Sequence, residues 1–67
     1  MALKIGDWVE YTGETIHGEH PQGKIVTIEK NRWDMITSYF VILDPGILVQ
    51  FKPHDLNWHK LEEMVSD

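Results

Sequence analysis

Apolar and polar residues alternate near the start of the chain. Between residues 8 and 12, Val9 and Tyr11 share one face of an extended segment, and Trp8 and Glu10 share the other. Such alternation is typical of a β-strand with one buried face. The sequence therefore predicts a first strand here, and it leaves open whether Trp8 lies inside or outside, because either position satisfies the alternation.

Residues 24–30 continue this pattern and are rich in β-branched side chains, which favour strands. Val26 and Ile28 fall on one face, which we expect to be the core face. Ile25 and Thr27 fall on the opposite face. The sequence predicts a second strand here, separated from the first by a polar loop that contains three glycines.

Two further strands are predicted to form a hairpin. Residues 38–43 are apolar on both faces, and Asp44-Pro45-Gly46 has turn chemistry, because proline fixes φ and glycine tolerates positive φ. A loop over residues 31–37 precedes the hairpin. In the return strand, residues 47–52, alternation directs three side chains toward the core and three away from it: Ile47, Val49 and Phe51 inward, and Leu48, Gln50 and Lys52 outward.

The fourth strand cannot continue past Pro53, which lacks a backbone N–H, and Asp55 favours a local turn bonded to its own backbone. We expect one short helical turn over residues 53–57, with Leu56 directed inward. A short last strand should follow over residues 58–62.

Short motifs at the predicted strands resemble those of a known architecture. The SH3-like barrels carry recurring Gly-Asp-x-Val, Gly-x-Val, Val-x-Phe and Leu-Glu motifs, which are similar to Gly6-Asp7-Trp8-Val9, Gly23-Lys24-Ile25-Val26, Val49-Gln50-Phe51 and, after Asp55-Leu56, Leu61-Glu62. The resemblance implies an all-β fold, a five-stranded SH3-like barrel with one short helical turn before the last strand. It implies no particular activity, because this fold carries many unrelated functions.

The chain length sets the scale of this fold. Sixty-seven residues suffice for a single domain, residues 1–67, with one modest core. We expect that core to be lined by six side chains from the five strands: Val9, Val26, Ile28, Val49, Phe51 and Leu61.

Composition narrows the class of protein. The chain has no cysteine, which fits a reducing compartment, and we expect a soluble cytoplasmic protein without a membrane span or a signal peptide. Six basic residues against eleven acidic ones give a net charge of −5. This charge disfavours binding along a phosphate backbone unless the basic residues gather on one face.

The histidines are the first candidates for chemistry. His17, Glu19 and His20 lie in one loop, and His54 and His59 flank the predicted helical turn, so three or four ligands could converge on a zinc or nickel ion. The spacing matches no established zinc motif, and solvent-exposed loop histidines explain the pattern as well. We therefore assign no metal site, no cofactor and no catalytic residue.

The aromatic residues are more informative. Aromatic side chains make up 10% of the chain, which is more than a barrel of this size is expected to bury, so some of them should lie at the surface. An apolar patch bordered by charges has the composition of a protein-binding surface. The residues that we expect to contact a partner are Trp33, Tyr39, Leu48, Gln50 and Trp58.

A second resemblance points to an enzyme. The segment from Asp44 to Pro53 is similar to the His-Pro-Gly-Ser-Val-Gln-Ile-Tyr-Pro segment of the type II dihydrofolate reductases, with one residue inserted, and Val49 and Gln50 match its Val-Gln. Those proteins are SH3-like barrels that assemble as tetramers around a pore lined by this strand. The resemblance implies folate and a reduced nicotinamide cofactor. Phe51 and Lys52 replace the Ile and Tyr of that family, Leu48 its Ser, and Glu10-Tyr11-Thr12 its basic run.

The sequence favours a non-catalytic module that binds another protein or a second copy of itself. Two alternatives remain. One is a tetrameric reductase that uses the strand Val49-Gln50-Phe51-Lys52. The other is a small barrel that binds nucleic acid, because aromatic platforms beside Lys and Arg also bind single strands.

Overall fold

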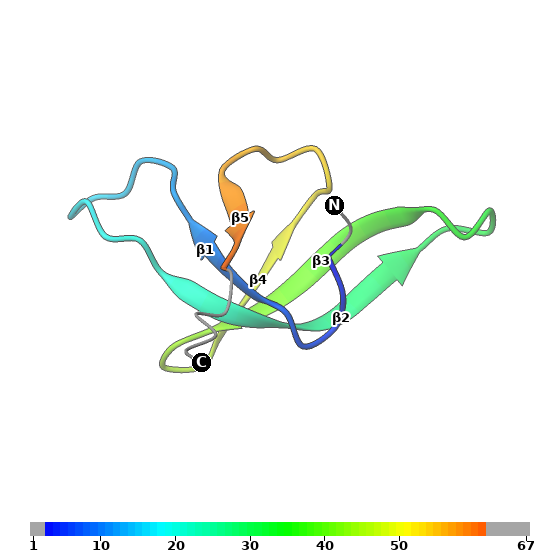
Figure 1. Ribbon diagram of the computed structural model, residues 1–67, viewed down its shortest axis with the longest axis horizontal. Helices are drawn as coiled ribbons and strands as arrows, with labels where there is room; N and C mark the ends of the chain where they lie inside the picture. The colour runs from blue at the N-terminus through cyan, green and yellow to red at the C-terminus, as the bar shows by residue number, and fades with distance from the viewer. Residues whose placement is uncertain (1–2, 62–67) are drawn as a thin grey trace, which may run out of the picture.

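A single antiparallel sheet organises the part of the chain that the structure, a computed structural model, describes, residues 3–61 (Figure 1). Its spatial order is β4-β3-β2-β1-β5. The strands are β1 Trp8–Tyr11, β2 Gln22–Lys30, β3 Ile36–Leu43, β4 Ile47–Phe51 and β5 Trp58–Lys60. The prediction of an all-β fold with five strands is confirmed, and residue 62 of the expected last strand lies outside the described residues.

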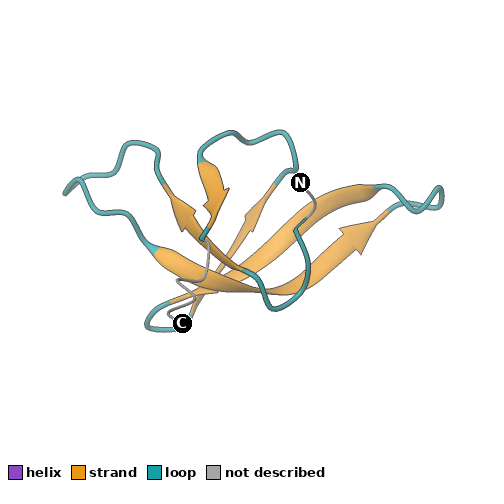
Figure 2. Cartoon of the chain, in the orientation of Figure 1, coloured by secondary structure: helices purple, strands orange, loops and turns teal. Residues whose placement is uncertain are grey.

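No helix is present among residues 3–61 (Figure 2), so the expected helical turn before β5 is wrong. The segment instead forms consecutive turns. The Asp55 N–H donates to the Lys52 carbonyl at 3.0 Å, and the Asp55 side chain accepts from the Asn57 N–H at 3.0 Å. This confirms the local turn expected at Asp55. Leu56 is 83% exposed rather than directed inward.

A β-bulge in β2 reverses the facing expected for Ile25 and Val26, whereas Ile28 packs against the core as expected. Ile25 pairs with Val41, but Thr27 pairs with Phe40, so Val26 is one extra residue on β2. A bulge shifts the alternation by one position, and residues on either side of it exchange faces. Ile25 is therefore fully buried and Val26 is 36% exposed. The expected inward position of Val26 is wrong.

The core lies on the inner face of the curved sheet. Its buried side chains are Val9, Ile25, Tyr39, Val41 and Phe51, and partly buried residues, Ile28 and Trp58 among them, pack against it. Gly23 is buried in the same region, where an added Cβ would overlap the Ile42 carbonyl oxygen and the Val41 side chain. Of the six expected core residues, Val49 and Leu61 are half-buried.

Aromatic side chains connect the two edge strands across the inner face. The Phe51 ring of β4 stacks on the Trp58 ring of β5 with 4.7 Å between centroids. Two tyrosines extend this cluster. Tyr39 of β3 stacks on Phe51, and Tyr11 of β1 lies tilted against Trp58, with 5.1 Å between ring centroids in each pair. The strand order contains no pairing between β4 and β5, so side chains, not backbone hydrogen bonds, link these edges in the described residues.

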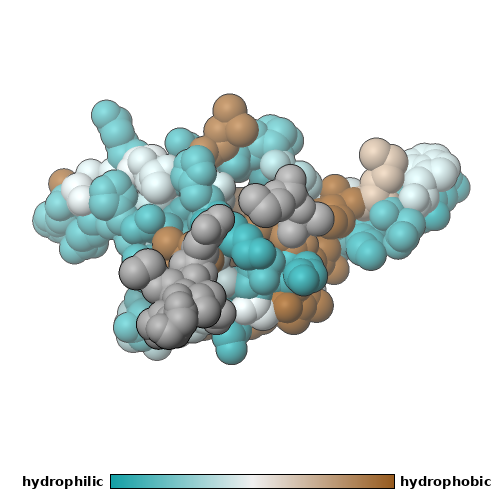
Figure 3. All heavy atoms as spheres, viewed as in Figure 1, coloured by the Kyte–Doolittle hydropathy of each residue, from teal (hydrophilic) through white to brown (hydrophobic). Residues whose placement is uncertain are grey.

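Two loops project from opposite ends of the molecule (Figure 1). One is the long connection between β1 and β2, and the other ends the β2–β3 hairpin. Hydrophobic residues gather over the middle of the molecule, and the projecting loops are mostly hydrophilic (Figure 3). On the sheet itself, the exposed large hydrophobic side chains are Trp8, Val26, Ile42, Ile47 and Leu48.

Candidate interaction surface

The five residues expected to bind a partner do not gather into one patch. Trp33 lies in the β2–β3 loop, and Leu48 and Gln50 lie on the outer face of β4. Tyr39 is only 6% exposed and belongs to the core, and Trp58 is half-buried against Phe51. The register explains the division, because Tyr39 pairs with Phe51 on the inner face of the sheet.

A row of side chains crosses the outer face of the sheet over four strands. Trp8 pairs with Lys24, Lys24 with Ile42, and Ile42 with Leu48. Paired residues of adjacent strands project from the same face, so these four residues form one continuous line, which we call the outer row. Its apolar members are well exposed, at 47% for Trp8, 43% for Ile42 and 61% for Leu48.

Lys24 is part of this surface rather than an interruption of it. Its Nζ lies 5.9 Å from the centre of the Trp8 ring, which is the geometry of a cation–π contact. The aliphatic part of a lysine side chain covers apolar surface while its ammonium stays in water. The outer row thus combines three apolar side chains with one positive charge.

Three members of the outer row, Trp8, Lys24 and Ile42, line an open groove of about 810 Å³. Val26, exposed by the bulge, adds another apolar side chain to its lining. The lining also includes His20 and Pro21 from the β1–β2 loop and Pro45 from the β3–β4 turn. The bulge therefore has a second consequence, since it places a valine on the outer face instead of in the core.

Polar contacts join β3 and β4 on the outer face, next to the outer row. Ser38 is buried, and its Oγ accepts hydrogen bonds from Gln50 Nε2 at 2.7 Å and from Lys52 Nζ at 3.2 Å. Neither an amide nor an ammonium can remove the serine proton, so this cluster positions side chains and does not activate a nucleophile. Gln50 is thereby fixed at the edge of the outer row.

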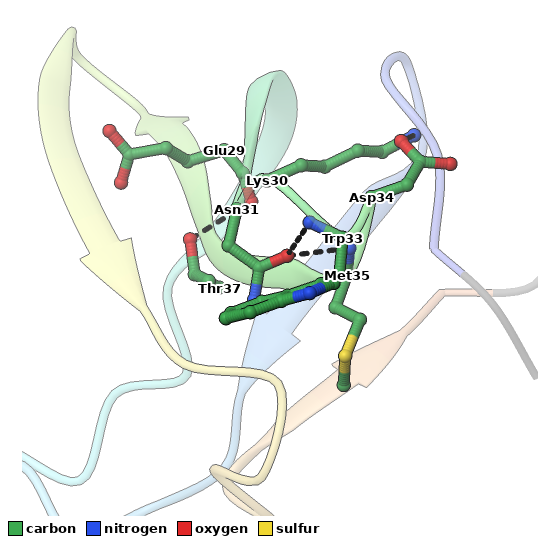
Figure 4. Close-up of polar contacts among 7 residues, drawn as sticks. All are labelled: Glu29, Lys30, Asn31, Trp33, Asp34, Met35 and Thr37. Carbon is green, nitrogen blue, oxygen red and sulfur yellow. Dashed lines mark hydrogen bonds and ion pairs between the residues drawn. The ribbon is translucent and has the colours of Figure 1, made fainter.

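The β2–β3 loop is organised by one asparagine (Figure 4). Asn31 Oδ1 accepts from the Trp33 N–H at 2.9 Å and from the Met35 N–H at 3.0 Å. The Asn31 N–H donates to the Met35 carbonyl at 2.9 Å, which closes the loop. Asp34 has a φ of 64°, in the left-handed region that asparagine, aspartate and glycine tolerate best.

This loop holds a second exposed aromatic group. Trp33 and Met35 are both more than half exposed, and the Arg32 guanidinium lies 4.7 Å from the centre of the Trp33 ring. A loop fixed by its own hydrogen bonds loses little conformational entropy on binding. Trp33 is thus an exposed side chain on an ordered loop at the end of the hairpin, apart from the outer row.

The histidines are placed separately. His20 Nδ1 lies 3.3 Å from the Tyr11 carbonyl oxygen, and His59 is on β5, across from Glu10. Within residues 3–61, no three His, Asp or Glu side chains lie in positions where they could hold a metal ion.

The sequence does not indicate that Trp8, Lys24 and Ile42 belong to one surface. Alternation already placed Trp8 opposite Val9, but nothing in the sequence chose which face is exposed. Residues 38–43 are apolar on both faces, so Ile42 gave no signal of an outward position. Only the register brings the three together.

Comparison with known proteins identifies no relative: no family model, curated protein or solved structure matches the chain. Across the described strands and loops, no helix has the length and hydropathy needed to cross a membrane. Any functional assignment therefore depends on the geometry of the surface itself.

Proposed function

We propose that the chain is a small SH3-like barrel that acts as a protein-interaction module and binds its partner through the outer row. The architecture is supported by the order of the strands, by the long loop after β1 and by the turns before β5. The Phe51–Trp58 stack supports a nearly closed barrel, because it brings side chains of the two edge strands into contact.

The observation that carries the interaction function is the outer row. Trp8, Lys24, Ile42 and Leu48 lie side by side in register, and the three apolar members are each more than two fifths exposed. Isolated exposed apolar residues are common, but several gathered on one face are typical of an interaction site. Tryptophan is also among the residues that contribute most to binding free energy at protein interfaces.

The charges of this surface favour a particular kind of partner surface. Lys24 lies inside the row, and the polar pair Gln50 and Lys52 lies beside it. A partner that places an apolar side chain against Trp8 and a carboxylate near Lys24 would satisfy both features. Trp33, at the end of the hairpin, provides a separate contact for a partner large enough to reach it.

A second candidate function, binding of single-stranded nucleic acid, is favoured by one observation. Each exposed tryptophan has a cation over its ring, Lys24 over Trp8 and Arg32 over Trp33. Base stacking beside a cation is how such strands are bound without sequence preference. Affinity for a single strand should fall steeply as salt is raised, whereas an apolar protein contact should change little.

The test uses a partner captured from the native host, purified and titrated against matched variants. Trp8→Ala and Leu48→Ala should each weaken binding by about tenfold or more, because each removes an exposed anchor. Leu56→Ala is the control, because it truncates another exposed leucine outside the outer row. Equal affinity of all three variants, with unchanged thermal unfolding, would contradict the proposed surface.

A further inference from the structure

The end of the described chain lies at one end of the outer row. The Leu61 N–H donates to the Trp8 carbonyl at 2.8 Å, which extends the β1–β5 pairing by one residue past Lys60. Because paired residues project from the same face, Leu61 stands beside Trp8 in line with the outer row. Residues 62–67, which we call the acidic segment, follow directly in the sequence and lie outside the described residues.

The acidic segment combines the two kinds of side chain that suit the outer row. It has three carboxylates and no basic group, and two apolar residues adjoin each other within it: Glu62, Glu63 and Asp67, and Met64 and Val65. The outer row has one cation, Lys24. Among residues 3–61, both ion pairs join other residues, so Lys24 has no carboxylate partner there. The charges of the segment and of the row are therefore complementary.

The length of the acidic segment also matches the outer row. The row continues from Leu61 over β1, β2 and β3 to Leu48 on β4, and these four steps between neighbouring strands span roughly 19 Å. Six extended residues reach about 20 Å. A chain that crosses the sheet in this direction meets Lys24 before Ile42 and Leu48. The two glutamates likewise precede the two apolar residues of the segment.

We propose that the acidic segment binds across the outer row of its own chain. Its glutamates pair with Lys24, and Met64 and Val65 pack on the apolar side chains of the groove, Val26 and Ile42 among them. The tether at Leu61 favours this occupant over a free peptide, because a short linker gives an effective concentration in the millimolar range. Contacts too weak to hold a separate molecule are then sufficient.

This binding would regulate the proposed function, because a partner has to displace the acidic segment from the outer row. The apparent affinity for a partner falls in proportion to the fraction of molecules whose row is free. A segment bound for two thirds of the time would therefore weaken partner binding about threefold. The inference rests on the proposed function in that it uses the outer row as a binding surface, but its test needs no partner.

A nitroxide spin label on the segment tests the inference in the whole chain. The chain has no cysteine, so Ser66→Cys provides a single attachment site. The label should broaden the NMR signals of Ile42 and Leu48 and leave those of Trp33 and Met35, at the end of the β2–β3 hairpin, unchanged. Absence of broadening at Ile42 and Leu48 would overturn the inference.

A variant with the same tether length separates binding from mere attachment. Met64→Ser with Val65→Ser removes the apolar contacts and should reduce the broadening at Leu48 by about threefold or more, because an unbound segment approaches this position only transiently. It should also tighten binding of a partner captured through the outer row. Equal broadening in the two labelled chains would mean that the segment is only tethered nearby, and this result would overturn the inference.

A charge exchange tests the contact with Lys24. Lys24→Glu should reduce the broadening at Leu48 by about twofold, the size expected of an exposed ion pair. Adding Glu62→Lys and Glu63→Lys to that variant should restore the broadening. Lys30→Glu, with the same change of charge at the other end of β2, is the control and should have no effect. Failure of the combined variant to recover would overturn the assigned pairing.

A mixing experiment distinguishes the chain's own segment from that of a second copy. Isotope-labelled chain without a nitroxide is mixed with unlabelled chain that carries one, and no broadening at Leu48 is expected. Broadening in the mixture would assign the contact to two copies and overturn the inference. The two proposals fail separately, since a partner that cross-links at position 48 supports the outer row whether or not the acidic segment binds there.

Discussion

The Phe51 ring lies parallel to the Trp58 ring, at an interplanar angle of 10° and a centroid distance of 4.7 Å. These residues belong to the two edge strands, which do not pair through their backbones. The stack therefore replaces ladder hydrogen bonds as the link between β4 and β5. It also explains why Trp58, expected to contact a partner, is half-buried against the core.

Removal of this stack should destabilise the fold. Trp58→Ala should lower the free energy of unfolding by about 3 kcal/mol, because it leaves a cavity between the two edge strands. Urea unfolding followed by circular dichroism gives this value. Trp33→Ala is the matched control and should change stability by less than about 0.5 kcal/mol, because Trp33 is 67% exposed. Equal effects of the two variants would contradict a structural role for Trp58.

The bulge in β2 predicts opposite results for two adjacent residues. Ile25→Ala should cost about 3 kcal/mol, because Ile25 is fully buried. Val26→Ala should cost less than about 1 kcal/mol, because Val26 borders the groove on the outer face. The same unfolding measurement compares them. A larger effect at Val26 would show that simple alternation holds and that the bulge is absent.

Gly23 should not tolerate a larger side chain. Gly23→Ala should cost about 2 kcal/mol, because a Cβ there would overlap the Ile42 carbonyl oxygen, and backbone atoms of β3 cannot move without loss of pairing. Lys24→Ala, at the next position on the exposed face, is the control and should have a small effect. A stable Gly23→Ala variant would mean that β2 and β3 are further apart than described.

Asn31 should control the order of the β2–β3 loop. Asn31→Ala removes the acceptor of two backbone hydrogen bonds and should cost about 1 kcal/mol. Asn31→Asp keeps the acceptor and should retain most of the stability. Amide hydrogen exchange at Trp33 and Met35 should accelerate only in the alanine variant. Equal exchange in both variants would show that the side chain does not order the loop.

The sequence predicted the strands better than their faces. The sequence located all five strands, with alternation as the signal for β1, β2 and β4, and Asp44-Pro45-Gly46 correctly marked the β3–β4 turn, where Gly46 has a φ of 133°. The facing of β2 could not be predicted, because Ile25, Val26 and Ile28 are all apolar and an extra residue leaves no trace in such a run. The contacts of Tyr39 depend on pairing with Phe51, which is distant in sequence.

The candidate site was predictable only in part. The exposed positions of Trp33 and Leu48 agree with the sequence, since one lies in a loop and the other on the outward face of a strand. The outer row depends on the register of four strands, and register is a property of the folded sheet. The local turn at Asp55 was likewise predicted from the sequence. The segment around it forms separate turns and not the expected helical turn.

Site-specific photo-cross-linking in the native host tests the central claim most directly. A photoreactive residue is placed at Leu48, in the outer row, or at Leu56, which is exposed outside it. The account predicts a defined adduct with a protein other than this chain from position 48, lost when Trp8→Ala is added, and none from position 56. The same adducts from both positions, or an adduct that survives Trp8→Ala, would contradict the outer row as the binding surface.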